Sequence, residues 1–156
     1  MDLQLGDRTA LVTGASTGIG RGIALDLASR QWKIAVCYRT SDAEAKTTAR
    51  EIVQRGGQAL AIRCNVSDPV AAKDMVTQVE KEWGRIDVLI NGAGPYHRIN
   101  LFDETIEGWN DMFDGNLHPI FYLAQAVAPG MKARKAGRII SFSMANADQM
   151  EAQPDV

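Results

Sequence analysis

The sequence has 156 residues, 46% of them hydrophobic, which is enough for one domain with a single buried core. Its 17 basic and 19 acidic residues give a formal net charge of -2, so no basic field exists to neutralise a phosphate backbone, and nucleic acid is not expected as a partner. It contains neither a basic-then-apolar leader nor an apolar run long enough to cross a bilayer, and these features predict a soluble cytoplasmic protein with no membrane partner.

Short apolar runs alternate along the chain with longer stretches of helical period, a pattern typical of βαβ units and a parallel sheet. The compact runs rich in valine and isoleucine predict strands at residues 9–12, 33–38, 59–65, 88–91 and 138–143. Stretches with an apolar stripe predict helices at residues 19–30, 43–55, 69–83 and about 105–135. Pro119 and Pro129 are expected to interrupt the last helix. The pattern predicts an α/β fold with a doubly wound parallel sheet.

Two helix ends carry recognisable signals. Gly56 and Gly57 are expected to close the second helix, because glycine readily adopts the conformation that follows a helix C-terminus. Asp68 and Pro69 are expected to open the third helix as a cap residue and a proline in the first turn. Cys37 and Cys64, the only cysteines, lie in apolar runs and are expected to be small buried thiols without a disulfide.

A glycine-rich turn follows the first predicted strand and reads Thr-Gly-Ala-Ser-Thr-Gly-Ile-Gly from Thr13 to Gly20. Glycine lets the backbone N–H groups approach a pyrophosphate without a Cβ in the way, and the N-terminus of the next helix attracts the anion. The alternative is that the glycines only shape a tight strand-to-helix connection. The agreement of strand, turn and helix favours a phosphate site formed by Gly14, Ser16, Thr17, Gly18, Ile19 and Gly20.

The spacing of this turn resembles the Thr-Gly-x-x-x-Gly-x-Gly motif of the short-chain dehydrogenase/reductase family. Residues 91–94, Asn-Gly-Ala-Gly, are similar to the family's Asn-Asn-Ala-Gly, with Gly92 in place of the second asparagine. Residues 65–66, Asn-Val, stand where the family often has Asp-Val at the adenine edge. Asn116 falls at the asparagine of the fourth helix, and residues 137–140 resemble the run into the fifth strand. The likeness is to the classical type and spans essentially the whole chain.

This resemblance implies an NAD(P)-binding Rossmann domain over residues 1–156, with five parallel strands in the order 3-2-1-4-5. It implies an NADP(H)-dependent oxidoreductase acting on a small-molecule carbonyl or alcohol substrate, for instance of the 3-oxoacyl-carrier-protein reductase kind. A homo-oligomer is expected for a full-length relative. The residues beyond the glycine turn that are expected to bind the cofactor are Tyr38, Arg39, Thr40, Asn65, Val66, Asn91, Gly92 and Ala93.

The end of the second strand predicts which nicotinamide cofactor is used. An acid at this position binds the ribose 2′-hydroxyl of NAD, whereas an arginine nearby accommodates the 2′-phosphate of NADP. Here the acid position is Tyr38 and Arg39 follows it, which predicts NADP(H) in preference to NAD(H), with Thr40 and Ser41 as hydroxyl donors. The alternatives are a solvated Arg39 and a capping role for Ser41 or Asp42. Asp42 is the nearby acid that could reverse the preference towards NAD.

The resemblance also implies a catalytic set of asparagine, serine, tyrosine and lysine. Asn116 matches the asparagine, although it could instead be a polar residue packed within a helix. The family's catalytic serine aligns with Met144, so Ser143 is a shifted candidate. The Tyr-x-x-x-Lys pair would be expected a dozen or more residues beyond the serine, and the sequence stops at Val156 before it.

We therefore expect this chain to be the N-terminal portion of the fold, with the C-terminal strands and helices missing and the fifth strand left as an exposed edge. The alternative to an oxidoreductase is a non-catalytic NADP-binding or scaffold protein, because the Tyr-x-x-x-Lys pair is absent from this chain. Tyr96 and His97 either touch the substrate or belong to a polar surface loop. His118 has no companion at metal-ligand spacing, and no metal site is expected.

Overall fold

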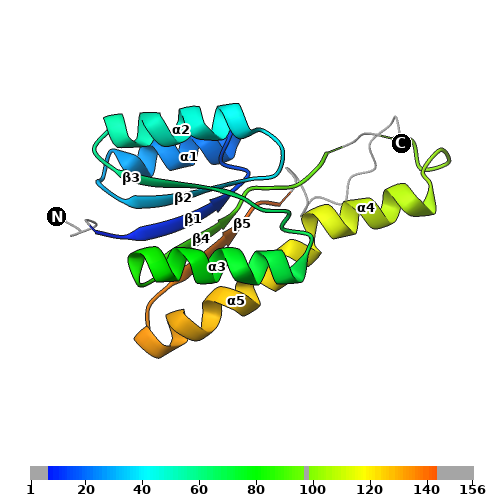
Figure 1. Ribbon diagram of the computed structural model, residues 1–156. Helices are drawn as coiled ribbons and strands as arrows, with labels where there is room; N and C mark the ends of the chain where they lie inside the picture. Colours follow the sequence, from blue (N-terminus) through cyan, green and yellow to red (C-terminus); the bar gives the residue numbers. More distant parts are fainter. Residues whose placement is uncertain (1–6, 97–98, 144–156) are drawn as a thin grey trace.

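The computed structural model describes residues 7–96 and 99–143. Within them, five parallel strands form one sheet in the order β3-β2-β1-β4-β5, which confirms the predicted order (Figure 1). The strands are β1 (Thr9–Thr13), β2 (Lys33–Tyr38), β3 (Gln58–Arg63), β4 (Val88–Asn91) and β5 (Arg138–Ser141). Because β2 and β4 lie on opposite sides of β1, the chain reverses its direction of winding there, and a crevice forms at the carboxyl ends of the strands.

Helices cover both faces of the sheet. α1 (Gly18–Ala28) and α2 (Asp42–Gln54) lie on one face, while α3 (Pro69–Trp83) and α5 (His118–Arg134) lie on the other (Figure 1). α4 (Ile106–Asn116) extends beyond the carboxyl edge of the sheet and packs against α5 (Figure 1). No helix in the described part of the chain is long and apolar enough to span a membrane.

The core is divided by the sheet because successive side chains of a strand point to opposite faces. Leu11, Ala35 and Leu89 pack towards α3 and α5, whereas their neighbours Val12, Val36 and Ile90 pack towards α1 and α2. Every residue of β1 is buried, as expected for the central strand of a sheet covered on both faces.

The predicted helix signals at α2 and α3 are confirmed. The Asp68 side chain accepts hydrogen bonds from the N–H groups of Val70 and Ala71, which otherwise have no partner at a helix start. Gly56, directly after the C-cap of α2, has a φ of +90°, the left-handed conformation that glycine adopts without strain.

Two strands end earlier than predicted, at Arg63 and Ser141. The reason is the length of their neighbours, since a strand continues only while an adjacent strand offers hydrogen-bonding partners. Arg63 pairs with Tyr38, the last residue of β2, and Ser141 pairs with Asn91, the last residue of β4. The residues that follow therefore belong to loops at the carboxyl edge.

The long helix predicted over 105–135 is two helices that meet at Leu117. Pro119 lies in the first turn of α5, where its missing N–H costs nothing, so the predicted interruption is confirmed there. Pro129 lies inside α5 without ending it, and the second predicted interruption is wrong. Pro129 lacks the N–H group that would donate a hydrogen bond within the helix. Val127 and Met131, on either side of it in the chain, are packed in the core, and this packing keeps the helix continuous.

The apolar stripe of α4 is not buried, contrary to the pattern's prediction. None of its residues is buried among the described part of the chain, and Trp109 and Phe113 stack on each other with ring centroids 5.0 Å apart. Among the described residues β5 is the edge strand of the sheet, and all four of its residues are exposed.

Candidate dinucleotide-binding site

A cleft of about 550 Å³ lies at the carboxyl ends of the strands, at the point where the winding reverses. It is lined by Gly14, Ser16, Thr17, Gly18, Ile19, Gly20, Cys37, Tyr38, Arg39, Thr40, Ser41, Cys64, Asn65, Val66, Ser67, Gly92, Ala93, Gly94, Pro95 and Gly115. Every residue predicted to bind the cofactor lines this cleft except Asn91.

The glycine turn leaves no room for a side chain at two positions, Gly14 and Gly20. Gly14 has a φ of +66°, and a Cβ on it would lie 2.7 Å from the carbonyl oxygen of Gly92. A Cβ on Gly20 would collide with the carbonyl oxygen of Gly14. The turn therefore packs backbone against backbone, which brings its N–H groups to the surface of the cleft.

The first turn of α1 presents unpaired N–H groups to the cleft. Thr17 is the N-cap residue with an extended backbone (φ -144°), and its side chain makes no capping hydrogen bond. The N–H groups of a first helical turn have no acceptor within the helix, so they remain available to an anion at this end. The turn itself is anchored by the Ala15 N–H, which donates to the Cys37 carbonyl at 3.2 Å.

The Thr13 hydroxyl fixes the opposite wall of the cleft. Its oxygen accepts hydrogen bonds from the N–H groups of Gly92 and Ala93, both at 3.0 Å. The same hydroxyl donates to the Ile90 carbonyl at 3.4 Å. This buried side chain therefore ties the loop after β4 to the end of β1. The sequence did not predict this role, because Thr13 was considered only as the first residue of the glycine-rich motif.

Asn91 does not line the cleft, and its predicted role in cofactor binding stays a prediction. The side chain is buried, and its Nδ2 donates to Ser141 Oγ at 3.1 Å, which links β4 to the edge strand β5. Its Oδ1 is buried without a hydrogen-bond partner among the described residues. Asn91 lies within β4, whose side chains point into the two packed layers, whereas the cleft opens beyond the end of the strand.

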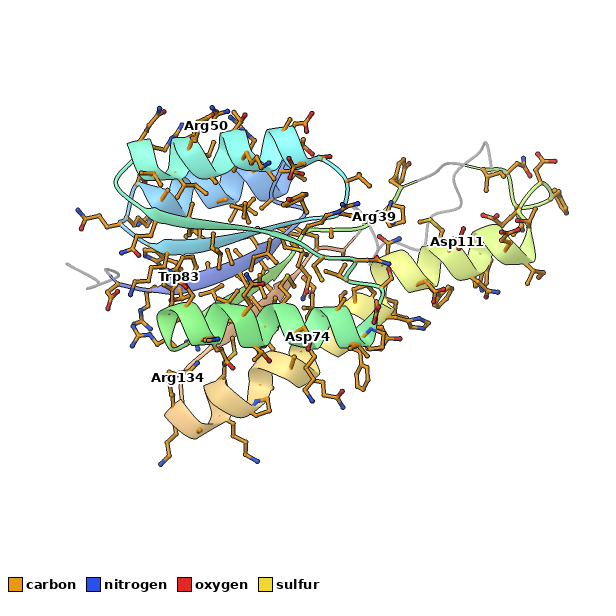
Figure 2. The ribbon with its side chains drawn as sticks, in the orientation of Figure 1. Arg39, Arg50, Asp74, Trp83, Asp111 and Arg134 are labelled. Atoms are coloured by element: carbon orange, nitrogen blue, oxygen red, sulfur yellow. The ribbon has the colours of Figure 1, made fainter. Side chains whose placement is uncertain are left out.

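Tyr38, Arg39 and Thr40 form the part of the cleft at the end of β2. The Arg39 side chain is exposed and has no hydrogen-bond or ion-pair partner among the described residues, and it lies at the carboxyl end of the sheet (Figure 2). Ser41 occupies the N-cap position of α2, as one of the alternatives predicted, but its side chain makes no capping hydrogen bond. Ser41 lines the cleft instead.

Asp42, the acid next in sequence, does not line the cleft. Its Oδ1 accepts a hydrogen bond from Tyr38 Oη at 2.6 Å, and its Oδ2 forms an ion pair with Lys46 Nζ at 2.7 Å. The hydrogen bonds from Lys46 and from Tyr38 lower the pKa of Asp42 below its usual range. The same bond to the Asp42 carboxylate raises the pKa of Tyr38, so this phenol stays protonated at neutral pH.

The loop after β3 forms the facing wall. Asn65 Oδ1 accepts from the Ser67 N–H at 3.3 Å, and Ser67 Oγ donates to the Asp114 carbonyl at 2.7 Å, which links this loop to α4. Cys37 and Cys64 also line this side as free, buried thiols, as predicted for their burial. A hydrogen bond to Cys64 and burial raise the pKa of the Cys37 thiol.

Neither predicted catalytic side chain lines the cleft. Asn116, the last residue of α4, donates through Nδ2 to the carbonyls of Pro95 at 3.1 Å and Met112 at 3.0 Å, so it braces the loop after β4. Ser143 is exposed two residues beyond β5 and makes no hydrogen bond within the described residues. Met144 and His97 lie outside the described residues.

Tyr96, the other candidate for substrate contact, is 81% exposed and does not line the cleft. The His118 ring contacts Asp114 Oδ1 at 2.8 Å, an exposed pair on neighbouring helices. In residues 7–96 and 99–143, no group of three or more histidine, cysteine, aspartate or glutamate side chains is arranged to hold a metal ion.

The sequence profile described as short chain dehydrogenase matches residues 8–154. The chain belongs to this family. Among curated short-chain dehydrogenases and their kin, it is 39% identical over 136 residues to the 3-oxoacyl-acyl-carrier-protein reductase FabG of Staphylococcus aureus, covering 87% of this chain and 55% of that protein. The chain thus spans about half the length of this curated relative. The likeness favours an enzyme of the family over a non-catalytic scaffold.

Solved short-chain dehydrogenases share the fold. A 7α-hydroxysteroid dehydrogenase complexed with NADH has a TM-score of 0.88 and 29% identity, over 96% of this chain and 58% of that chain. An actinorhodin polyketide ketoreductase variant with NADPH has a TM-score of 0.86 and 31% identity, over 94% and 56% of the two chains. Because similar folds hold either dinucleotide, the choice between them must come from individual side chains.

One wall of the cleft in this short-chain dehydrogenase was not predicted from the sequence. Gly94, Pro95 and Gly115 meet there because α4 and the loop after β4 are brought together in space. The contact between Gly115 and Pro95 is so close that a Cβ on Gly115 would collide with the proline ring. Only a view of the loops in three dimensions could reveal this wall, since its members are about 20 residues apart in the chain.

Proposed function

We propose that this chain supplies the NADP(H)-binding part of an oxidoreductase that moves hydride between the cofactor and a small carbonyl or alcohol substrate. The observation that carries the proposal is the arrangement at the end of β2. A tyrosine stands at the acid position, Arg39 lines the cleft without an acidic partner among the described residues, and the nearby Asp42 is turned to Tyr38 and Lys46.

The residues of the cleft fit the groups of a phosphorylated dinucleotide. The glycine turn and the start of α1 would hold the pyrophosphate, since their N–H groups and helix dipole favour an anion. Arg39 would hold the 2′-phosphate, with Thr40 as a hydroxyl donor, because a guanidinium matches phosphate geometry. Asn65 and Val66 would border the adenine, and Gly92 and Ala93 the opposite part of the cofactor.

When bound, a nicotinamide cofactor supplies the hydride chemistry itself. This chain's contribution is binding and orientation, because Thr13 fixes the loop carrying Gly92 and Ala93 and Asn116 braces Pro95. The likeness to the Staphylococcus aureus reductase supports a 3-oxoacyl thioester as the substrate class. We extend the proposal to Asn116 and Ser143 as residues near the reacting groups, to a homo-oligomer and to a cytoplasmic location, on the same family resemblance.

The test compares the binding of NADPH and of NADH to the purified full-length protein. Binding is measured as the change in the fluorescence of the reduced cofactor. Arg39→Ala should weaken NADPH binding on the order of 10-fold, as expected for a lost charge-assisted phosphate contact, and leave NADH binding nearly unchanged. Arg50→Ala is the matched control, because Arg50 is an exposed arginine on α2 that does not line the cleft (Figure 2). Tighter binding of NADH than of NADPH by the unmodified protein would contradict the proposal.

A further inference from the structure

The carboxylate of Asp42, at the start of α2, does not line the cleft. Both of its oxygens are engaged, Oδ1 by the Tyr38 hydroxyl at 2.6 Å and Oδ2 by the Lys46 ammonium at 2.7 Å. Asp42 and Lys46 border a separate depression along α2, together with Ala61 of β3. Residues 38–41, which precede Asp42 directly, all line the cleft. Asp42 is therefore a carboxylate next to the cleft that the fold keeps out of its lining.

The two groups that hold Asp42 differ in rigidity. The Lys46 pair spans one turn of α2, with side chains 66% and 52% exposed, and exposed pairs of this kind are screened by water and salt. The Tyr38 residue is only 8% exposed, and its ring is packed among the core residues under α1 and α2. A fixed donor on a short bond to a charged acceptor is the stronger restraint. Tyr38 is thus the group that sets the direction of Asp42.

Two arginines, Arg39 and Arg63, lie near the end of β2. Arg63, which pairs with Tyr38 across the sheet, donates through Nε to the Arg39 carbonyl at 3.1 Å. Arg39 lines the cleft three residues before Asp42 in the chain. A carboxylate released by Tyr38 would find Arg39 as a cation without an acidic partner among the described residues, and pairing with it would compete with any phosphate at that guanidinium.

We infer that Tyr38 is a specificity-determining positioning residue, which holds the Asp42 carboxylate outside the cleft and so leaves Arg39 free to bind the 2′-phosphate of NADP(H). The inference rests on the proposed function. Tyr38 acts here through Asp42 and Arg39, because its own hydroxyl is committed to the Asp42 carboxylate.

The test is a double-mutant cycle on the full-length protein, with the ratio of the Kd for NADH to the Kd for NADPH as the readout. Tyr38→Phe removes only the hydroxyl and should lower this ratio by about 3- to 10-fold, chiefly by weakening NADPH binding. Asp42→Asn removes the charge and should not lower the ratio. In the Asp42→Asn background, Tyr38→Phe should leave the ratio unchanged, because no carboxylate remains to be released. A merely structural role of Tyr38 would change the binding of both dinucleotides in both backgrounds.

Tyr122→Phe is the control for the loss of a tyrosine hydroxyl, since Tyr122 lies on α5 and does not line the cleft. The effect of Tyr38→Phe should shrink at high salt, because it is a charge effect. An unchanged ratio in Tyr38→Phe, or an equal shift with and without Asp42, would overturn the inference while leaving NADPH binding intact. If the unmodified protein binds neither dinucleotide, the proposed function itself fails, so the two outcomes are distinct.

Discussion

The Thr13 hydroxyl oxygen accepts a hydrogen bond from the Gly92 N–H at 3.0 Å and thereby joins the carboxyl ends of β1 and β4. The same oxygen accepts from Ala93, so one side chain satisfies two backbone donors at the edge of the cleft. This contact places the loop after β4 opposite the glycine turn, and the shape of the cleft depends on it.

Thr13→Val should therefore destabilise the protein and loosen the loop. Valine has the same shape but no acceptor, so two N–H groups lose their partner, at a cost of about 1–3 kcal/mol. For a chain of this size that corresponds to a fall in Tm of roughly 3–9 °C in a thermal melt. Thr13→Ser, which keeps the oxygen, should retain most of the stability. A larger loss for serine than for valine would contradict the prediction, because it would show that the methyl group contributes more than the hydroxyl.

Gly20→Ala should abolish dinucleotide binding, because the added Cβ meets the backbone carbonyl of Gly14 and the turn must shift. A loss of more than about 10-fold in affinity is expected in a fluorescence titration. Gly22→Ala provides a close control, since Gly22 lies in the same helix with open space where its Cβ would stand. That substitution should stabilise α1 by about 0.5–1 kcal/mol and leave binding intact. Similar dinucleotide affinities for Gly20→Ala and Gly22→Ala would show that the collision of the added Cβ with the Gly14 carbonyl does not matter for binding.

Asn116→Asp should loosen the loop that carries Pro95. The amide donates to the carbonyls of Pro95 and Met112, and a carboxylate at the same place would repel both oxygens. Faster amide hydrogen exchange is expected in residues 92–96, with a smaller effect in acid, where a protonated side chain can still donate one hydrogen bond. Asn110→Asp, an exposed change on the same helix, should leave the exchange of that loop unchanged.

Titration at high pH should show that Tyr38 ionises late. The hydrogen bond to Asp42 raises the pKa of Tyr38 above its ordinary value of 10.0. Because this folded-state pKa lies above the unfolded one, the stability from the bond is complete below pH 10 and is lost as the pH rises through the folded-state pKa. Asp42→Asn should move the late ionisation back towards 10.0 in an absorbance titration, and no movement would contradict the hydrogen bond.

The stability contributed by Asp42 depends on pH in the opposite direction to that contributed by Tyr38. Bonds from Lys46 and Tyr38 lower the pKa of Asp42 below its ordinary value of 3.8, so the stability they give is present above that value and is lost as the pH falls through the folded-state pKa. We expect the Asp42 resonance in an NMR titration to have its midpoint below pH 3.8, and Lys46→Met should shift that midpoint upwards. A midpoint at the ordinary value in the unmodified protein would mean that the ion pair does not form in solution.

Local patterns were enough to predict the alternating strands and helices, the caps at Asp68 and Gly56 and the glycine turn, because each of these depends on residues close together in the chain. The strand order, which pairs segments far apart in the chain, was implied by the family resemblance. Alternation of apolar residues and the geometry of glycine act over a few positions, so they can be read directly from the sequence. The same is true of the stretch from Tyr38 to Thr40, which the sequence placed at the cleft and which the fold puts there.

Only the tertiary structure decided where the other side chains point. Asn91 belongs to a recognisable motif, yet its side-chain amide donates a hydrogen bond to Ser141 of β5. The amide of Asn116 donates to the Pro95 carbonyl and does not line the cleft. The Thr13 hydroxyl meets N–H groups about 80 residues away in the chain, a contact that no local pattern encodes. The sequence by itself determined the helices, the strands and the glycine turn. Packing between distant segments decided which polar groups remain available to a ligand, because each hydrogen bond made inside the fold uses a donor or acceptor that the ligand would need.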